Sequence, residues 1–444
     1  MEQLYKLPEY VEFAIERLRG RGFDAYVVGG CVRDMIMGRE PSDYDMTTNA
    51  RPEETAECFS DFHVIETGLK HGTVTVVIDY RPIEITTFRF DGEYDDNRHP
   101  KAVTFTKDLR DDLARRDFTV NAMAYNHEVG VVDAFGGVED IKRGIIRCVG
   151  DPDTRFSEDG LRIMRALRFS ATLGFEIDEK TAESVHKNRE LLKNISAERI
   201  KDEFSKLICG EGATAVLREF YDVIGVFIPE ILPCVGFEQN TKYHDRDVFE
   251  HTLAVIDSCP YFDKALRLAA FFHDIAKPEC YTEDERGGHF YGHAQKGAEA
   301  VSEIMGRLKY DNDMKRKVRR LVSEHMTPLE PTEKSVRRFI SAHDDESAGR
   351  ALMLAIADRL SCAPEFADIS VFLEIKEIRD RLKAEEDRIS LKTLAVHGDD
   401  LMALGFCGKE IGKCLEFLLS QVLDGELPNE KEALLLAAKQ KIEK

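Results

Sequence analysis

Tyr26-Val-Val-Gly-Gly-Cys-Val-Arg-Asp34, followed closely by Ser42-Asp43-Tyr44-Asp45, is the stretch of this sequence that decides the fold. It predicts a short β-strand, a glycine turn and the start of a helix, because Tyr and Val favour strands and glycine tolerates a tight turn. Backbone N–H groups in such a turn, together with a helix N-terminus, can bind phosphate. We therefore expect Gly29 and Gly30 to hold a phosphate group, with Arg33 reaching its oxygens.

Two aspartates follow this turn. The run Tyr44–Thr47 reads as a strand, and on a strand residues i and i+2 point to the same face, so Asp43 and Asp45 should lie side by side. Neighbouring carboxylates can hold a pair of Mg²⁺ ions that activate an attacking hydroxyl and steady a triphosphate. Glu84, on a later apolar strand, is a candidate third carboxylate. An isolated Asp-x-Asp is usually a solvated turn, but the preceding glycine turn favours the metal site.

Outward from this stretch, the sequence divides into two zones. Up to about residue 150, helix and strand signals alternate, and the β-rich runs Thr73–Ile78 and Ile83–Phe88 are close enough to form a hairpin. A parallel pair would need a longer crossover, so we expect a small α+β head with an antiparallel or mixed sheet. From Arg155 onward helical periodicity continues, which predicts an elongated all-α body.

Composition excludes several classes of protein. The 444 residues carry 62 Lys+Arg and 83 Asp+Glu, a net charge of −21, so nucleic acid would have to be met by a local basic face. No apolar run approaches the roughly 20 residues that cross a bilayer, and no export signal is visible. The ten cysteines include no Cys-x-x-Cys pair. These features predict a cytoplasmic, multidomain protein with reduced thiols and no membrane association.

Five ordered motifs resemble one family. They are Gly29–Asp34, Asp43-x-Asp45, Arg115-Arg116-Asp117-Phe-Thr-Val-Asn-Ala-Met-Ala124, Asp133-Ala-Phe-Gly-Gly137, and Glu158-Asp159-Gly-Leu-Arg162-Ile-Met-Arg165-Ala-Leu-Arg168-Phe169. Together they resemble the nucleotidyltransferase head of the bacterial class II tRNA CCA-adding enzymes and poly(A) polymerases. The resemblance implies that tRNA, CTP and ATP are the substrates and Mg²⁺ the cofactor. Asp43 and Asp45 would be the catalytic metal ligands.

The last motif suggests how a base is chosen without a template. Good helix formers fill Glu158–Arg168, Ser157 is a plausible N-cap, and Asp159, Arg162 and Arg165 would form one stripe of the helix. An aspartate accepts from an exocyclic amino group and an arginine donates to a ring nitrogen or carbonyl. Such a pair fits cytosine and adenine but not guanine or uracil. For an isolated stripe, however, an ion-paired surface helix would be the better interpretation.

The same resemblance assigns further roles. It implies that Asp159 and Arg162 read the base and that three more arginines hold the nucleotide: Arg116, Arg165 and Arg168. Gly68–Val76 resembles the CCA-adding version of this region, and Phe88–Pro100 resembles a flexible loop that CC-only enzymes lack. An A-adding enzyme or a poly(A) polymerase is the alternative within the same chemistry.

A second cluster of metal-binding residue types lies in the body, where six of the thirteen histidines fall between 244 and 325. Neutral imidazoles and carboxylates suit a divalent metal, and metal-held water can act as a hydrolytic nucleophile. The order of these residues resembles the HD superfamily of phosphohydrolases. The resemblance implies a site for Mn²⁺, Ni²⁺ or Mg²⁺ and activity on RNA ends or nucleotides, a function that could instead be the main one. The expected first ligands are His251, His273, Asp274 and Asp358, and His293 and His325 are candidates for a second ion.

These observations predict four segments and no obligatory protein partner. The segments are a nucleotidyltransferase head at 1–150, a helical neck that binds nucleotide and RNA at 151–235, an HD phosphohydrolase-like domain at 236–365, and a helical, tRNA-binding tail at 366–444.

Overall fold

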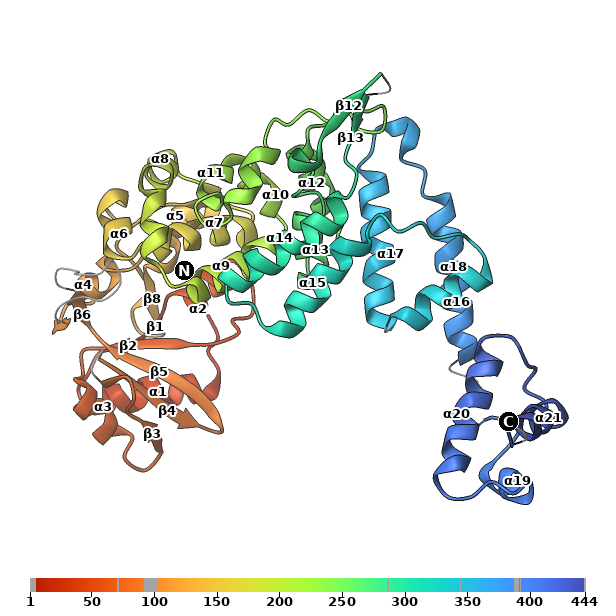
Figure 1. Ribbon diagram of the computed structural model, residues 1–444. Helices are drawn as coiled ribbons and strands as arrows, with labels where there is room; N and C mark the ends of the chain where they lie inside the picture. Colours follow the sequence, from red (N-terminus) through yellow and green to blue (C-terminus); the bar gives the residue numbers. More distant parts are fainter. Residues whose placement is uncertain are drawn as a thin grey trace. The chain divides into compact units, whose positions relative to one another are not determined.

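The computed structural model describes residues 5–69, 72–91, 103–285, 287–343, 345–386, 391 and 393–442 (Figure 1). The chain forms two compact units. The first comprises Met1–Phe237, Pro260–Leu268 and Ala300–Lys315, and the second comprises Glu238–Cys259, Ala269–Glu299 and Arg316–Lys444. The division into four functional segments remains a prediction.

A seven-stranded sheet forms the head, with strand order β3-β4-β5-β2-β1-β8-β9. Its strands are β1 (Ala25–Val28), β2 (Asp45–Thr48), β3 (His63–Ile65), β4 (Thr73–Ile78), β5 (Arg81–Thr87), β8 (Met123–Asn126) and β9 (Gly130–Asp133). All neighbours pair antiparallel except β2 and β5, which are parallel and place Asp45 opposite Glu84. The expectation of a small α+β head with a mixed sheet is therefore confirmed.

Alternation along the strands explains why helices cover both faces of this sheet. Val27 joins a core with residues of α1 (Glu9–Gly20), α2 (Gly30–Ile36) and α3 (Pro52–Cys58). The adjacent Val28 belongs instead to a smaller cluster that includes Leu113 of α4 (Leu109–Ala114).

The hairpin predicted between residues 73 and 88 is present as β4 and β5. Asp79 and Tyr80 form its turn at φ values of 50° and 62°, the positive values that a tight two-residue hairpin requires. The strand predicted at Tyr44–Thr47 begins one residue later, at Asp45. A further pair, β6 (Arg89–Asp91) and β7 (Val103–Phe105), flanks residues 92–102. Most of the expected flexible loop at Phe88–Pro100 lies outside the described residues.

A helical array follows the head. It consists of α5 (Gly137–Arg143), α6 (Pro152–Glu158), α7 (Leu161–Leu173), α8 (Glu179–Asn188), α9 (Ala197–Ile208), α10 (Ala213–Glu219) and α11 (Tyr221–Ile224), with a short parallel pair, β10 (Ile145–Ile146) and β11 (Glu176–Ile177). One helix was expected over residues 158–168, but the chain breaks at Asp159, which has φ −141° and ψ 105°. The expected N-cap at Ser157 is wrong, because Ser157 lies in the last turn of α6 and its hydroxyl donates to the Thr154 carbonyl.

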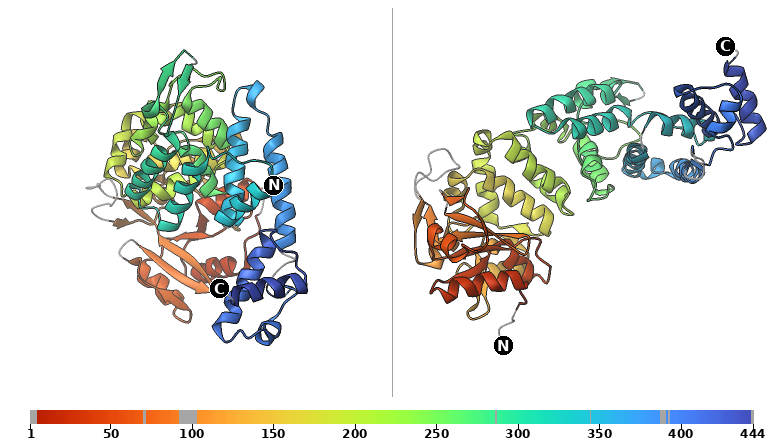
Figure 2. Two further views of the ribbon diagram at one scale, coloured as in Figure 1. Left: turned by 45° about the vertical axis from the view of Figure 1, so that its right-hand side comes forward. Right: turned by 90° about the horizontal axis from the view of Figure 1, so that it is seen from below.

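Helices also dominate the rest of the chain (Figures 1 and 2). They are α12 (Val248–Asp257), α13 (Lys264–Phe272), α14 (His293–Arg307), α15 (Asn312–Glu324), α16 (Glu333–Ala342), α17 (Asp345–Leu360), α18 (Ser370–Glu386), α19 (Gly398–Ala403), α20 (Lys409–Leu423) and α21 (Lys431–Ile442). The exception is a hairpin of β12 (Thr282–Asp284) and β13 (Gly287–His289). Apolar residues of α16, α17 and α18 share one core, and those of α19, α20 and α21 share another.

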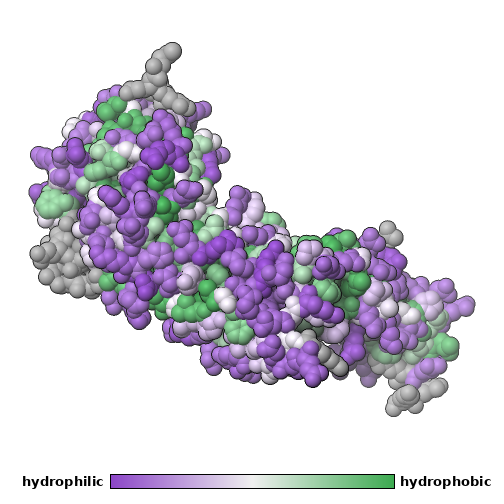
Figure 3. All heavy atoms as spheres, turned by 90° about the horizontal axis from the view of Figure 1, so that it is seen from above, coloured by the Kyte–Doolittle hydropathy of each residue, from purple (hydrophilic) through white to green (hydrophobic). Residues whose placement is uncertain are grey.

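The surface is predominantly polar on the face shown in Figure 3, where hydrophobic residues form small scattered patches. Among the residues described, no helix combines the length and the apolar character that crossing a membrane requires.

Gly137 provides a test of how the motifs pack. A Cβ at Gly137 would overlap the Thr119 carbonyl oxygen and lie 2.9 Å from the Met123 sulfur. We expect Gly137→Ala to lower the free energy of unfolding by about 2 kcal/mol or more, because backbone would have to move. Gly306, in α14 of the same unit, has open space around its Cα, so Gly306→Ala should raise it by up to about 1 kcal/mol. Equal urea midpoints for the two variants would contradict the close packing of Gly137 against Thr119 and Met123.

Candidate active site and metal centre

The glycine turn of the head is built as expected. Gly29 follows β1 at φ +84°, and α2 begins at Gly30. A Cβ at Gly29 would lie only 3.0 Å from a terminal nitrogen of Arg116, so glycine here lets a guanidinium approach the turn. Asp112 holds that guanidinium at 3.4 Å. Arg33 lies on α2 and donates to Asp34 and Asn121.

Three carboxylates gather beside this turn. Asp45 is the first residue of β2, and Glu84 lies opposite it on β5. Asp43 precedes the strand, so the expectation that both aspartates lie on one strand is wrong, although their charges still interact. Burial raises the pKa of Asp45, and the negative charges of Asp43 and Glu84 raise it further. A divalent cation would relieve this repulsion, but among the described residues the side chains close enough for three of them to hold one ion lie in the second unit.

Three arginines surround one aromatic ring in the same unit. The guanidinium carbons of Arg33, Arg165 and Arg168 lie 5.3, 5.2 and 3.9 Å from the ring centre of Phe169, distances typical of cation–π contacts. Phe169 is 6% exposed and packs edge-on against Phe118. The structure therefore brings together three of the predicted nucleotide-binding side chains, which start from two helices.

Buried acids balance these positive charges. Asp117 lies 2.6 Å from Arg165, and Glu203 lies 2.5 Å from Arg168. Burial alone would raise the pKa of Asp117, but the charges of Arg165 and Arg162 outweigh it and lower the pKa to about 2. Asp117 also accepts a hydrogen bond from the Phe118 backbone, which fixes the carboxylate in place.

The two residues predicted to read the base, Asp159 and Arg162, do not lie on one stripe of a single helix. Asp159 lies at the break between α6 and α7, and its carboxylate pairs with Arg199 of α9 at 2.9 Å. Arg162 lies on α7, is 9% exposed, and donates to Glu158 at 2.5 Å and to the Arg115 carbonyl at 2.9 Å. Sequence reasoning missed Arg199, because it lies 40 residues from its partner and no local pattern marks it.

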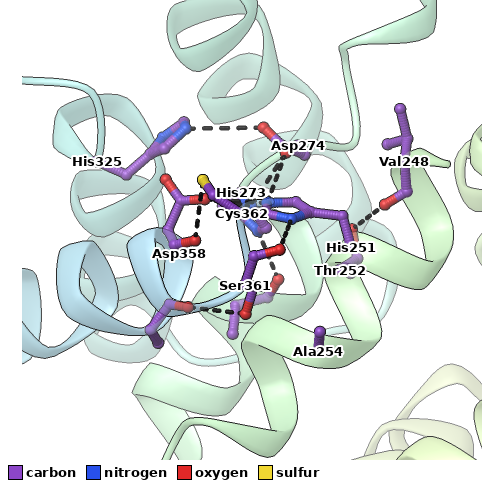
Figure 4. Close-up of polar contacts among 12 residues, drawn as sticks. Val248, His251, Thr252, Ala254, His273, Asp274, His325, Asp358, Ser361 and Cys362 are labelled. Atoms are coloured by element: carbon purple, nitrogen blue, oxygen red, sulfur yellow. Dashed lines mark hydrogen bonds and ion pairs between the residues drawn. The ribbon is translucent and has the colours of Figure 1, made fainter. Parts of the chain in front are cut away.

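The histidine–aspartate cluster of the second unit is brought together as predicted (Figure 4). Nε2 of His251 lies 2.9 Å from Asp358 and 3.6 Å from Asp274, and Nε2 of His273 lies 3.1 Å from Asp274. On the other side of Asp274, Nε2 of His293 lies at 3.3 Å and Nε2 of His325 at 3.8 Å. Asp274 therefore belongs to two possible three-ligand groups, one with His251 and His273 and one with His293 and His325.

These residues occupy turns and helix ends as well as helices. His273 and Asp274 follow the end of α13 at Phe272. His251 lies inside α12, which begins at Val248. His325 follows α15, and Asp358 lies within α17.

Backbone carbonyls orient all four imidazoles. Nδ1 of His251, His273, His293 and His325 lies 3.2, 2.8, 2.7 and 2.7 Å from the carbonyl oxygens of Ser361, Ala270, Phe290 and Val322. Donation from Nδ1 leaves Nε2 as the metal-binding nitrogen.

The remaining inner atoms fit a metal ion. Among the described residues, Nε2 of His273 and Oδ2 of Asp274 are buried without a hydrogen bond of good geometry. Burial lowers the pKa of His325 to about 4, which keeps that imidazole neutral. Burial would raise the pKa of Asp274, but His273 and Lys277 lower it well below its usual value. A metal requires neutral imidazoles and an ionised carboxylate. Burial would lower the pKa of His273, but the charge of Asp274 outweighs it and raises that pKa, so a bound metal would have to displace the proton of His273.

Comparison with known proteins agrees with this geometry. Residues 25–147 match the poly A polymerase head domain, residues 174–231 match the probable RNA and SrmB-binding site of polymerase A, and residues 290–438 match domain 2 (putative) of tRNA nucleotidyltransferase. Fold and site together thus define a nucleotidyltransferase of the poly(A) polymerase head class.

Individual relatives show to which family within this class the chain belongs. The chain is 33% identical to the CCA-adding enzyme of Limosilactobacillus fermentum over 425 residues, which cover 96% of this chain and 94% of that enzyme. It is 48% identical to the CCA-adding enzyme of Lactobacillus helveticus, where the match spans about half of each chain, 50% of this one and 56% of the relative. The chain belongs to the family of CCA-adding enzymes. The nucleotidyltransferase fold of that family implies the use of divalent metal ions.

Solved structures are similar over nearly the whole chain. The CCA-adding enzyme of Bacillus stearothermophilus in complex with CTP is 28% identical, with a TM-score of 0.67, and the match covers 98% of this chain and 97% of that one. The Thermotoga maritima CCA-adding enzyme complexed with tRNA shares the fold, with 20% identity, a TM-score of 0.59 and coverage of 97% and 94%.

The Asp117–Arg165 pair makes a testable contribution to stability. Because the folded-state pKa of Asp117 is about 2, its contribution is present above the unfolded pKa near 4 and is lost as the pH falls towards 2. We expect Asp117→Asn to lower the free energy of unfolding by about 2 kcal/mol at pH 7. The difference from the unmodified protein should shrink below pH 4, as measured by urea unfolding.

Asp153 provides the matched control. Hydrogen bonds, the strongest from Lys187, also lower its pKa to about 2, but its side chain is 42% exposed, so solvent screens the pair. Asp153→Asn should therefore cost clearly less. Equal losses for the two variants would show that burial of Asp117 adds nothing.

Proposed function

We propose that this protein adds C, C and A to the 3′ end of tRNA, using CTP and ATP and no nucleic-acid template. The observation that carries this proposal is a set of three acidic side chains beside the glycine turn, Asp43, Asp45 and Glu84. They lie in the same unit as a cluster of arginines. The tRNA 3′-hydroxyl attacks the α-phosphate of the nucleotide and pyrophosphate leaves. Asp43 and Asp45 would hold divalent ions, of which Mg²⁺ is the expected one. Such ions activate the hydroxyl and neutralise phosphate charge.

The arginine cluster gives the triphosphate its binding site. Gly30 can offer its backbone N–H group, whereas the N–H of Gly29 already donates to the Met123 carbonyl at 3.1 Å. Arg116 lies against the turn. Arg165 and Arg168 are held by carboxylates and by the ring of Phe169. Because these side chains are already ordered, little conformational entropy is lost when a nucleotide binds.

Base choice is assigned to Asp159 and Arg162. The carboxylate accepts from the amino group of cytosine or adenine, and the guanidinium donates to the neighbouring ring nitrogen or carbonyl. Arg199 pairs with Asp159 and Glu158 pairs with Arg162, and these contacts orient both side chains. The pair admits either base, which supports one pocket for both nucleotides.

The relatives support CCA addition over A addition or polyadenylation. Those matched over most of their length are CCA-adding enzymes, and solved relatives contain CTP, ATP or tRNA. A tRNA substrate also agrees with a cytoplasmic location.

Removing the carboxylates tests this function. We expect Asp43→Ala and Asp45→Ala each to lower incorporation about 10³-fold or more, because electrostatic positioning supplies most of the catalysis. Glu53→Ala, at an exposed carboxylate in α3, should leave the rate unchanged. The assay incubates tRNA lacking CCA with each nucleotide separately and together.

The nucleotide pattern separates the alternatives. Addition of C from CTP alone, followed by A only after both cytidines, supports CCA addition. Addition of A to tRNA ending in CC, without any addition of C to tRNA lacking CCA, would identify an A-adding enzyme, and long A tails would identify a poly(A) polymerase. Near-normal incorporation by both aspartate variants would overturn the metal assignment.

A second function is supported by the buried histidine–aspartate cluster. We infer that it binds a divalent metal and hydrolyses phosphate esters of nucleotides or RNA ends. Four imidazole nitrogens and two carboxylates favour Mn²⁺ or Ni²⁺ over Mg²⁺. A metal would supply a bound water as the nucleophile, and the residues around it hold the ester and exclude bulk water.

Metal content tests the second function directly. We expect His273→Ala to lower the bound metal, measured by mass spectrometry of the purified protein, at least 10-fold. It should also abolish hydrolysis of 2′,3′-cyclic AMP, because the group formed by His251, His273 and Asp274 loses a ligand. His63→Ala, an exposed histidine of β3, should change neither quantity. Unchanged metal content and an unchanged rate in His273→Ala would contradict the assignment.

A further inference from the structure

The histidine–aspartate cluster opens into a cavity of about 570 Å³. This volume is much larger than a phosphate group needs and lies in the range of pockets that hold ligands of nucleotide size. One part of the lining is polar and comes from the metal cluster and its surroundings: Asp274, Lys277, His293, His325 and Asp358. The other part is aromatic or apolar: Tyr243, Phe290, Tyr291, Met326 and Phe372.

Tyr291 is the most unusual member of the aromatic part. It is 79% exposed, although it lines the same cavity as the metal cluster. Its ring stacks on His289 with a centroid distance of 5.3 Å and an interplanar angle of 16°. Nε2 of His289 lies 2.9 Å from Asp284 across the β12–β13 hairpin, so the hairpin holds the supporting ring. One face of the Tyr291 ring is backed and most of the side chain remains in water.

Such a platform suits another flat ring. Base–aromatic stacking is worth about 1–3 kcal/mol per base, and every base has a face that can stack. An exposed tyrosine gains that energy without first breaking other contacts.

The cavity joins this platform to the phosphate chemistry. Gly292, at φ +79°, is the only residue between Tyr291 and the candidate metal ligand His293. Lys277 lies 2.7 Å from Asp274 and 5.2 Å from the ring centre of Phe290, so a positive charge lies between the cluster and the aromatic lining. Arg359 adds a second cation to the lining. A molecule with a phosphate at one end and an aromatic base at the other fits this order.

We propose that Tyr291, backed by His289, stacks on the nucleobase of the molecule whose phosphate ester is hydrolysed at the histidine–aspartate cluster. The substrate class is thus a nucleotide, free or at an RNA end, and base-free phosphate esters are poor substrates. The proposal rests on the proposed phosphohydrolase function. In the reaction the oxygen of a water joins phosphorus, the P–O ester bond breaks, and the leaving oxygen takes a proton from the water.

A single tryptophan tests the stacking without any hydrolysis. The chain contains no Trp, so Tyr291→Trp places a unique fluorophore at the platform. We expect AMP to quench its emission in a saturable way, and ribose 5-phosphate at the same concentrations to have no effect. Phe262→Trp, at a position that is also 79% exposed but outside the cavity, reports collisional quenching and should show no saturation. Equal responses to AMP and ribose 5-phosphate, or equal responses of the two variants, would overturn the proposal.

Hydrolysis assays separate this proposal from the function beneath it. If the unmodified protein hydrolyses neither 2′,3′-cyclic AMP nor ribose 5-phosphate, the proposed phosphohydrolase function is refuted. The fluorescence result would still decide whether Tyr291 stacks on a base. If cyclic AMP is hydrolysed, Tyr291→Ala should lower its kcat/KM about 10-fold or more through KM, and Tyr291→Phe should restore it. Hydrolysis of ribose 5-phosphate should not change. A loss of both activities in Tyr291→Ala would indicate a structural role instead.

The source of the nucleotide is a separate arm of the same experiment. Titration of the Tyr291→Trp variant with a short oligoribonucleotide that ends in a 2′,3′-cyclic phosphate is compared with titration by AMP. Tighter saturable quenching by the oligonucleotide identifies an RNA end as the occupant, and tighter quenching by AMP identifies a free nucleotide. Absence of quenching by either ligand overturns the proposal.

Discussion

Repulsion between like charges is the constraint on which the head depends. Several guanidinium groups gather in a protein whose net charge is −21, and each would destabilise the others if it stood alone. The fold meets this by placing a carboxylate beside each cation: Asp34 beside Arg33, Asp112 beside both Arg115 and Arg116, Asp117 beside Arg165 and Glu203 beside Arg168. Two of these acids are also fixed by hydrogen bonds, Asp112 from the Thr47 hydroxyl and Asp117 from the Phe118 backbone. The cations therefore remain in place when no phosphate is bound, and the site is ordered before it is used.

The parts of the fold that sequence predicted are those governed by local rules. The strand, glycine turn and helix around Gly29 follow from side-chain preferences over a few residues, and so does the hairpin closed by Asp79 and Tyr80. The break at Asp159 was missed although a local signal was present, because Asp159-Gly160 is a dipeptide typical of turns and the helical interpretation of Glu158–Arg168 passed over it. Its carboxylate is held by Arg199, a contact between residues distant in sequence. Likewise, the β12–β13 hairpin arises in an acidic and glycine-rich run with no alternating pattern.

The histidine–aspartate cluster was predicted by residue type and order, but its construction was not. Histidines are rare enough that several within one region indicate a common site. The groups that orient them are backbone carbonyls, such as those of Ala270 and Val322, and every residue has one. No sequence pattern can therefore reveal which carbonyl will be used. The same holds for His273, since its place just beyond a helix end depends on packing rather than on periodicity.

The parallel pairing of β2 with β5 links chemistry to a purely apolar requirement. Glu84 stands opposite Asp45 only in the observed alignment, and its neighbours Ile83 and Ile85 are buried at 1% exposure. A shift of β5 by one residue would preserve the ladder of backbone hydrogen bonds but expose both isoleucines to water. It would also point an alkyl side chain at the acidic cluster. Burial of apolar side chains on one face of β5 thus fixes the register of the strand, and the register fixes the position of the Glu84 carboxylate on the other face.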